Sequence, residues 1–170
     1  MGVSRKGKYV LKIIVCDAGP ILHLAEVKSI ELILNMGDIY IPHAVQMELM
    51  QYKLNLPNQF QILNLTGTEE AEANTITQNG KIHRGEAEAI ILVKRISADY
   101  LLTDDATARL YAEINKINVH GSLGIVLWNL IHKNINKEQA RSLIFDLKKS
   151  SLWVSEQVFQ RVIKILNEMN

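Results

Sequence analysis

The chain has 170 residues, of which 48% are hydrophobic and 22% are charged. This length and composition indicate one globular domain over residues 1–170 with a hydrophobic core, and they exclude a long disordered tract. The formal net charge of +1 excludes a protein that binds nucleic acid through a strong overall basic field, so a nucleic-acid role must depend on a local site or patch.

Cys16 is the single cysteine, which excludes an intrachain disulfide and a cysteine-based zinc site. It lies in an apolar run, where we expect an inert core thiol. That run contains Lys12 and is far too short to span a bilayer. We therefore expect a cytoplasmic protein without a membrane partner.

Strands and helices are expected to alternate from the start of the chain. The apolar, β-branched stretch 9–16 predicts a buried strand, and Pro20 predicts the first position of a helix. A second short helix over 29–36 ends at a glycine. Residues 38–42 predict another strand, and a helix over 43–51 follows it.

The alternation continues through the middle of the chain. Residues 60–65 predict a weaker strand, and Thr68 with the two glutamates after it resembles the start of a helix. Residues 85–96 predict a strong helix, 99–103 a buried strand and 106–115 another helix.

The last third of the chain is expected to be mainly helical. Residues 117–121 predict the final strand, and Ser122 is expected to cap a helix over 123–133. Two amphipathic helices, 136–149 and 155–168, form a helical C-terminal extension that packs on the domain. The whole pattern favours an α/β fold of three layers, α/β/α, with a mostly parallel central sheet.

Acidic residues lie near the ends of the expected strands. In an open α/β sheet, the binding crevice lies outside the carboxyl ends of the strands. Asp17 directly follows the first strand, although helix capping explains a lone aspartate there about equally well. One of two adjacent aspartates is expected to cap helix 106–115, but a pair exceeds the need of one cap. The catalytic candidates are Asp17, Glu48, Glu86, Glu88, Asp104 and Asp105.

Carboxylates gathered at one point need a counter-charge, because like charges raise one another's pKa values. A bound divalent cation supplies that charge. Oxygen ligands without histidine or thiolate suit Mg²⁺ or Mn²⁺, and magnesium held by carboxylates and water is usual in phosphoryl chemistry. The acids therefore predict a Mg²⁺ or Mn²⁺ site that activates water for attack on a phosphate ester.

Four stretches of the sequence carry a likeness to a known family. They are VCDAGPILHLAEVKSIELI (15–33), IYIPHAVQMELM (39–50), RGEAEAIILVKRISADYLLTDDATARLYAE (84–113) and VHGSLGIVL (119–127). In this order and spacing they resemble the PIN-domain nucleases, most closely a prokaryotic PIN-like branch whose helical tail is similar to residues 152–166. The resemblance covers nearly the whole chain.

The resemblance implies a doubly wound fold, a Mg²⁺ or Mn²⁺ site and cleavage of single-stranded or structured RNA. Many members are toxins paired with small antitoxin proteins, and many form homodimers, so it implies these partners as well. The family's four acidic positions match Asp17, Glu48, the stretch 85–90 and Thr103–Asp105. The implied metal ligands are Asp17, Glu48, Glu88, Asp104 and Asp105.

Two details of this match need the structure. Glu86 and Glu88 point about 200° apart on a helix, so only one can face the metal. The spacing leaves open which one does, and the other is expected to cap the helix or to pair with Arg84 or Arg109. Many PIN domains carry a hydroxyl residue after the first aspartate, whereas this chain has Ala18 and Gly19 there. This loss weakens the prediction of activity more than that of metal binding, because water can replace a hydroxyl ligand.

Several residues near the acids are candidates for contact with substrate. Those for phosphate or substrate binding are Thr103, His83, Arg84, Arg109 and Lys53. The five histidines show no metal-ligand spacing, and we expect most to be structural. Trp128 and Trp153 are expected on apolar helix faces, in the core or at an interface. The apolar stripe of helix 123–133 is either core or a dimer surface; it comprises Leu123, Val126, Leu127, Trp128 and Leu130.

Two functions remain open on this sequence. The first is a Mg²⁺- or Mn²⁺-dependent endoribonuclease, with a toxin as its biological form. The second is a non-catalytic RNA-binding or interaction module, which the missing hydroxyl favours. A haloacid-dehalogenase-type phosphatase needs an aspartate where Gly19 stands, and a response-regulator receiver needs an acidic pair at strand one. Glycine-rich phosphate-binding motifs are absent.

Overall fold

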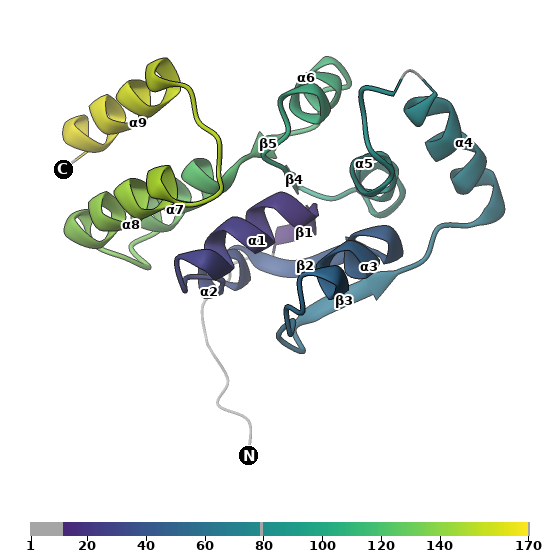
Figure 1. Ribbon diagram of the computed structural model, residues 1–170, viewed down its shortest axis with the longest axis horizontal. Coiled ribbons are helices and arrows are strands. Elements are labelled where there is room, and N and C mark those ends of the chain that lie inside the picture. Colours follow the sequence, from purple (N-terminus) through teal and green to yellow (C-terminus); the bar gives the residue numbers. More distant parts are fainter. Residues whose placement is uncertain (1–11, 79, 170) are drawn as a thin grey trace.

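The central sheet of the computed structural model contains five parallel strands in the order β3-β2-β1-β4-β5 (Figure 1). The structure describes residues 12–78 and 80–169. Its strands are β1 (Lys12–Cys16), β2 (Gly37–Pro42), β3 (Phe60–Leu63), β4 (Tyr100–Leu102) and β5 (Val119–His120). Strand order runs outward from β1 in one direction and from β4 in the other. The sheet therefore has a topological switch point beside the carboxyl end of β1, and α/β sheets bind ligands at such points.

The middle strand β1 is buried on both faces. Side chains alternate along a strand, so Ile14 and Cys16 enter one apolar cluster while Val15 enters the other. All three side chains are fully buried. Burial on both faces is typical of parallel sheets that have helices on each side.

Helices cover both faces of the sheet. The cluster around Ile14 contains side chains from α1, α2, α3, α7, α8 and α9. The cluster around Val15 contains side chains from α4, α5 and α6. The expected three-layer α/β/α fold is therefore confirmed. The sheet is wholly parallel.

The first helices follow the strands closely along the chain. Their bounds are Ala18–Glu26 for α1, Glu31–Leu34 for α2, His43–Gln51 for α3 and Gly67–Thr77 for α4. Those of the second half are Arg84–Ile96 for α5, Ala106–Ile114 for α6, Ser122–Ile131 for α7, Lys137–Lys149 for α8 and Glu156–Glu168 for α9.

The C-terminal helices α8 and α9 join the larger apolar cluster. Ala140, Ile144 and Leu147 of α8 are fully buried, and Phe159 and Leu166 of α9 are nearly so. The helical C-terminal extension therefore packs on the core of the sheet.

Predicted element bounds lie within two residues of the observed ones, but three predicted helix starts are wrong. Helix α1 begins at Ala18 and not at Pro20. Helix α4 is capped by Thr66 and not by Thr68, because Glu69 returns its carboxylate to the Thr66 backbone N–H at 2.7 Å. Gly121, not Ser122, precedes α7 as its N-cap. The predicted strand residues 9–11 lie outside the described part of the chain.

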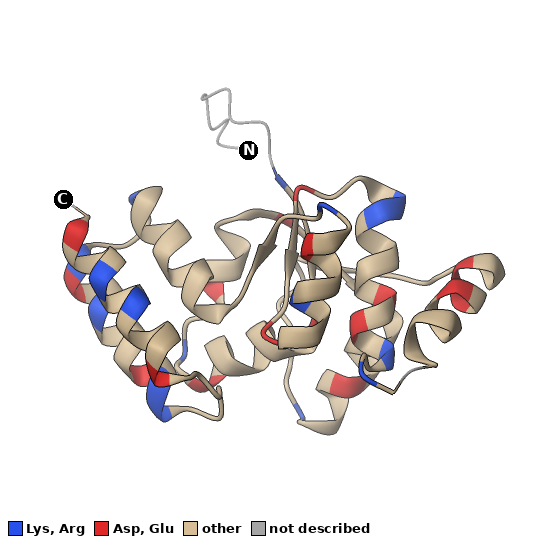
Figure 2. Ribbon diagram, turned by 90° about the horizontal axis from the view of Figure 1, so that it is seen from above, with Lys and Arg blue, Asp and Glu red and all other residues tan. Residues whose placement is uncertain are grey.

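Charges of both signs are mixed over the molecule, including its C-terminal helices (Figure 2). Among residues 12–78 and 80–169, no helix is both long and apolar enough to span a membrane.

Candidate functional site

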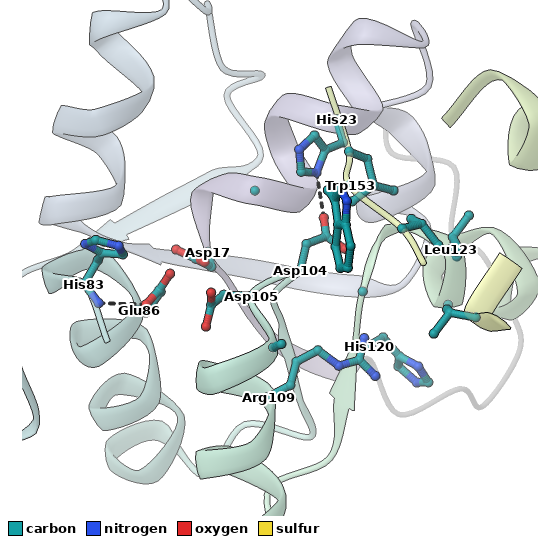
Figure 3. A pocket seen from close by; sticks show the side chains of 18 of the residues that line it. Asp17, His23, His83, Glu86, Asp104, Asp105, Arg109, His120, Leu123 and Trp153 are labelled. Atoms are coloured by element: carbon teal, nitrogen blue, oxygen red, sulfur yellow. Dashed lines mark hydrogen bonds and ion pairs between the residues drawn. The ribbon is translucent and has the colours of Figure 1, made fainter. Parts of the chain in front are cut away.

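A cleft of about 1490 Å³ lies at the carboxyl ends of β1 and β4. Asp104 and Glu113 line it together with four further acidic side chains from separate segments, of which Asp17, Glu86 and Asp105 are labelled in Figure 3. These four are Asp17 after β1, Glu48 in α3, Glu86 in α5 and Asp105 before α6. The strand-end rule therefore located acids that the fold does bring into one cleft.

Asp17 is the most deeply placed of these acids, with only 6% of its surface exposed. Its backbone N–H donates to the Leu102 carbonyl at 2.9 Å, which holds it against the end of β4. Burial is the largest cause that raises the pKa of Asp17 to about 7, and the nearby charges of Glu86 and Glu48 contribute to this shift. Its side chain accepts no capping bond from α1, so capping does not explain this buried acid.

Glu48 lies near Asp17 at the place where α3 packs closely against α5. A Cβ placed on Gly85 would lie 3.4 Å from Glu48 Oε2 and 3.6 Å from Asp17 Oδ1. Both carboxylate oxygens therefore border the same small space, beside the first turn of α5. The missing side chain at Gly85 allows this approach, and the positive end of the helix dipole favours carboxylates there.

Glu86 and Glu88 point to different surroundings. Glu86 accepts the His83 backbone N–H at 2.7 Å and points toward Asp17 and Asp105 (Figure 3). Partial burial raises the pKa of Glu86, with a contribution from the charge of Asp105. Glu88 is buried, is absent from the cleft lining, and pairs with Arg84 Nε at 2.5 Å.

Glu88 also accepts the Ala44 backbone N–H at 3.3 Å. Its contacts are those of a group that ties α5 to α3. Glu88 was among the implied metal ligands although the choice between the two glutamates was open; of the two, Glu86 is the one that lines the cleft.

The adjacent aspartates also differ. Asp105 caps α6 by accepting the Ala108 N–H at 2.7 Å through Oδ1, and its carboxylate points toward Asp17 and Glu86 (Figure 3). Asp104 turns the other way. It accepts His23 Nδ1 at 2.7 Å, the Ser122 N–H at 2.7 Å and the Ser122 hydroxyl at 2.6 Å.

Asp104 is therefore held by donors of α1 and α7, and it joins those helices to the end of β4. This arrangement does not support its predicted role as a metal ligand. His23 and Ser122 were not predicted as its partners. Ser122 is free to bond Asp104 because Gly121 occupies the cap position of α7.

Thr103 supplies the hydroxyl that the sequence lacks after Asp17. Its Oγ1 donates to Asp17 Oδ2 at 3.1 Å and accepts the Asp105 N–H at 3.3 Å. Only 1% of Thr103 is exposed, so burial does not favour direct contact with substrate, which stays a prediction. It is a positioning residue that connects two of the carboxylates.

The residues predicted to contact phosphate differ in whether other side chains already bind them. His83 and Arg109 line the cleft, but Arg84 is committed to Glu88 and Asn74. In the described segments, Arg109 forms no salt bridge. Burial and, second to it, the charge of Arg109 lower the pKa of His120. Lys53 does not line the cleft.

The remaining predictions concern apolar residues. Cys16 is fully buried, and burial raises the pKa of its thiol well above the usual value, so an inert thiol is confirmed. In α7, Leu123 and Val126 are core residues, and the half-buried Trp128 packs against them and stacks on His132. Trp153 does not lie on a helix face; it is in the connection between α8 and α9.

Divalent magnesium or manganese fits the chemistry of the acidic cluster. Its donors are carboxylate oxygens, and burial, with smaller contributions from neighbouring carboxylates, raises the pKa values of Asp17 and Glu86; a bound cation would oppose both effects. Over the segments described, no three His, Cys, Asp or Glu side chains stand close enough to form a ready-made ion site. The carboxylates would hold an ion after small side-chain rotations or through water.

Comparison with known proteins agrees with this geometry. The sequence profile of the PIN domain matches residues 13–168. No curated protein matches the chain significantly. PIN domains are generally nucleases that act on nucleic acid with divalent metal ions. The matched region includes Asp17, Glu48, Glu86 and Asp105 and extends through the C-terminal helices, and the chain belongs to the PIN-domain family.

Proposed function

We propose that the protein is a Mg²⁺- or Mn²⁺-dependent endoribonuclease that hydrolyses RNA phosphodiester bonds. The ion would be held by Asp17, Glu48, Glu86 and Asp105. The observation that carries this proposal is the state of Asp17, a buried strand-end carboxylate whose pKa is raised to about 7. A buried carboxylic acid with a raised pKa is typical of a functional site.

The ion would supply a Lewis acid that activates water and neutralises charge on the phosphate. The protein's own residues prepare that site. Thr103 holds Asp17 Oδ2 at 3.1 Å, which leaves Oδ1 on the side of Glu48 and Gly85. Arg109, in the same cleft, offers a positive charge to a substrate phosphate.

Cleavage of a mixed RNA pool in Mn²⁺ tests this proposal. Wild type should cut the RNA, EDTA should stop it, and Asp17→Asn should reduce the rate by about 100-fold or more. Asp146→Asn is the matched control, because Asp146 is exposed on α8 and outside the cleft. Equal rates for wild type and Asp17→Asn would show that the nuclease assignment is wrong.

The non-catalytic alternative depended on the absence of a hydroxyl beside Asp17. Because Thr103 supplies one, we favour the active enzyme. A toxin role, a small antitoxin partner, a homodimer and a cytoplasmic location are further proposals, supported by the family resemblance and by ordinary composition. A neighbouring gene for a small DNA-binding protein would support the toxin role.

A further inference from the structure

Trp153 is the most exposed of the large hydrophobic side chains in the described part of the chain. Its exposed fraction is 84%, against 49% for Val158 in the helix that follows. Burial of an aromatic side chain normally stabilises a fold, so this indole contributes little to the core. An exposed indole at the edge of a functional cleft therefore suggests contact with a ligand.

The segment that carries Trp153 is fixed on both sides. Leu152, directly before it, is only 7% exposed and belongs to the main core cluster, and Val154, directly after it, packs against that cluster. Ser151 donates its backbone N–H to Glu26 Oε2 at 2.8 Å, which attaches the connection to α1. The chain thus holds Trp153 outward at a defined position.

Trp153 lines the same cleft as the acidic cluster (Figure 3). Arg109 of α6 and Arg161 of α9 also line this cleft, and neither forms a salt bridge among the residues described. The same cleft therefore carries carboxylates, an aromatic face and two arginines.

This pattern matches the alternating chemistry of a single-stranded nucleic acid. Arginines bind backbone phosphates, and exposed aromatic faces stack on unpaired bases. The net charge of +1 and the mixed charges of the surface (Figure 2) leave electrostatic attraction weak overall. Stacking is then needed to hold the strand. The arginines and the aromatic face share the cleft of the proposed nuclease site, so the surroundings favour RNA.

We propose that Trp153 is a stacking platform for an unpaired base of the RNA, in the cleft that Arg109 and Arg161 also line. The proposal rests on the proposed nuclease function, since it names how that function's substrate is held. It implies a single-stranded substrate, because a paired base presents no free face.

Binding of a fluorescent single-stranded RNA, measured by anisotropy in Ca²⁺, tests the stacking. We expect Trp153→Ala to weaken binding by about 5- to 100-fold. Trp153→Phe should remain within about threefold of wild type, because it keeps an aromatic face. Trp153→Leu should resemble Trp153→Ala, because it keeps only apolar surface. Ile131→Ala, exposed and outside the cleft, is the control and should change nothing.

An RNA with a single abasic position, moved along the strand, completes the test. At one position the missing base should weaken binding to wild type and should have no further effect on Trp153→Ala. Wild-type affinity in Trp153→Leu, or no RNA binding by wild type, would overturn the proposal.

The stacking proposal and the nuclease proposal fail separately. If Trp153 variants lose RNA binding while Asp17→Asn cleaves like wild type, the platform stands and the nuclease site is wrong. If Asp17→Asn abolishes cleavage while Trp153→Ala binds RNA normally, the nuclease stands without a platform at Trp153.

Discussion

Replacing Asp17 with asparagine should make the protein more stable at neutral and alkaline pH while it abolishes cation binding. The pKa of Asp17 rises from 3.8 to about 7 on folding. At about 1.36 kcal/mol for each pKa unit, ionised Asp17 costs the folded state about 4 kcal/mol relative to its protonated form. Asp17 is only 6% exposed, so solvent screening does not reduce this value much.

The direction of the pH dependence follows from the same shift. The folded state holds the proton of Asp17 more tightly than the unfolded chain does. The stabilisation that this proton gives to the folded state is therefore fully present below pH about 4. It is lost as the pH rises toward 7. The amide introduced by Asp17→Asn carries no charge and can still accept the Thr103 hydroxyl, so the stability of this variant should not fall over this range.

Urea unfolding of both proteins between pH 4 and 8 measures this difference. At pH 8 the Asp17→Asn variant should exceed wild type in free energy of unfolding by up to about 4 kcal/mol, and at pH 4 the two should be similar. Added Mg²⁺ should stabilise wild type at pH 8 and leave the variant unchanged. A variant that is less stable than wild type at pH 8 would show that Asp17 is a satisfied structural carboxylate.

Substitutions at four positions, Thr103, Glu86, Glu88 and Asp104, separate the roles of the neighbouring residues. Thr103→Val should reduce cation affinity by about tenfold in a Mn²⁺ titration, and Thr103→Ser should restore it, because the hydroxyl positions Asp17; equal affinities would contradict this role. In the cleavage assay, Glu86→Gln should lose far more activity than Glu88→Gln, and the reverse order would restore Glu88 as the ligand. Asp104→Ala should lower the free energy of unfolding by about 2–3 kcal/mol, because it leaves the donors of His23 and Ser122 unpaired. A change below about 0.5 kcal/mol in urea unfolding, on the order of an ordinary surface substitution, would contradict that structural role.

The acids at strand ends could be predicted because one topological rule places them. Asp17 and Asp105 follow β1 and β4, and an open parallel sheet brings both ends to the same edge. Their environments could not be predicted. Asp104 and Asp105 are equivalent in sequence, and they differ because His23, 81 residues from Asp104, and Ser122 turn Asp104 away.

Side-chain contacts seen only in the folded structure bear on the other open points. Helix periodicity separates Glu86 from Glu88 but does not show which faces Asp17; the Arg84 pair and the Ala44 N–H decide it. Trp153 was expected on a helix face. Its position depends on a bond between Ser151 and Glu26, which are 125 residues apart, and no local pattern predicts such a contact.

The location of a bound ion tests the central claim most directly. Crystals soaked in Mn²⁺ and measured at the manganese absorption edge would show the ion as an anomalous peak. We predict a peak in contact with Asp17, with further ligands from Glu48, Glu86 or Asp105. A peak coordinated by Asp104 or Glu88, or none beside Asp17 at saturating Mn²⁺, would contradict this assignment of the metal centre.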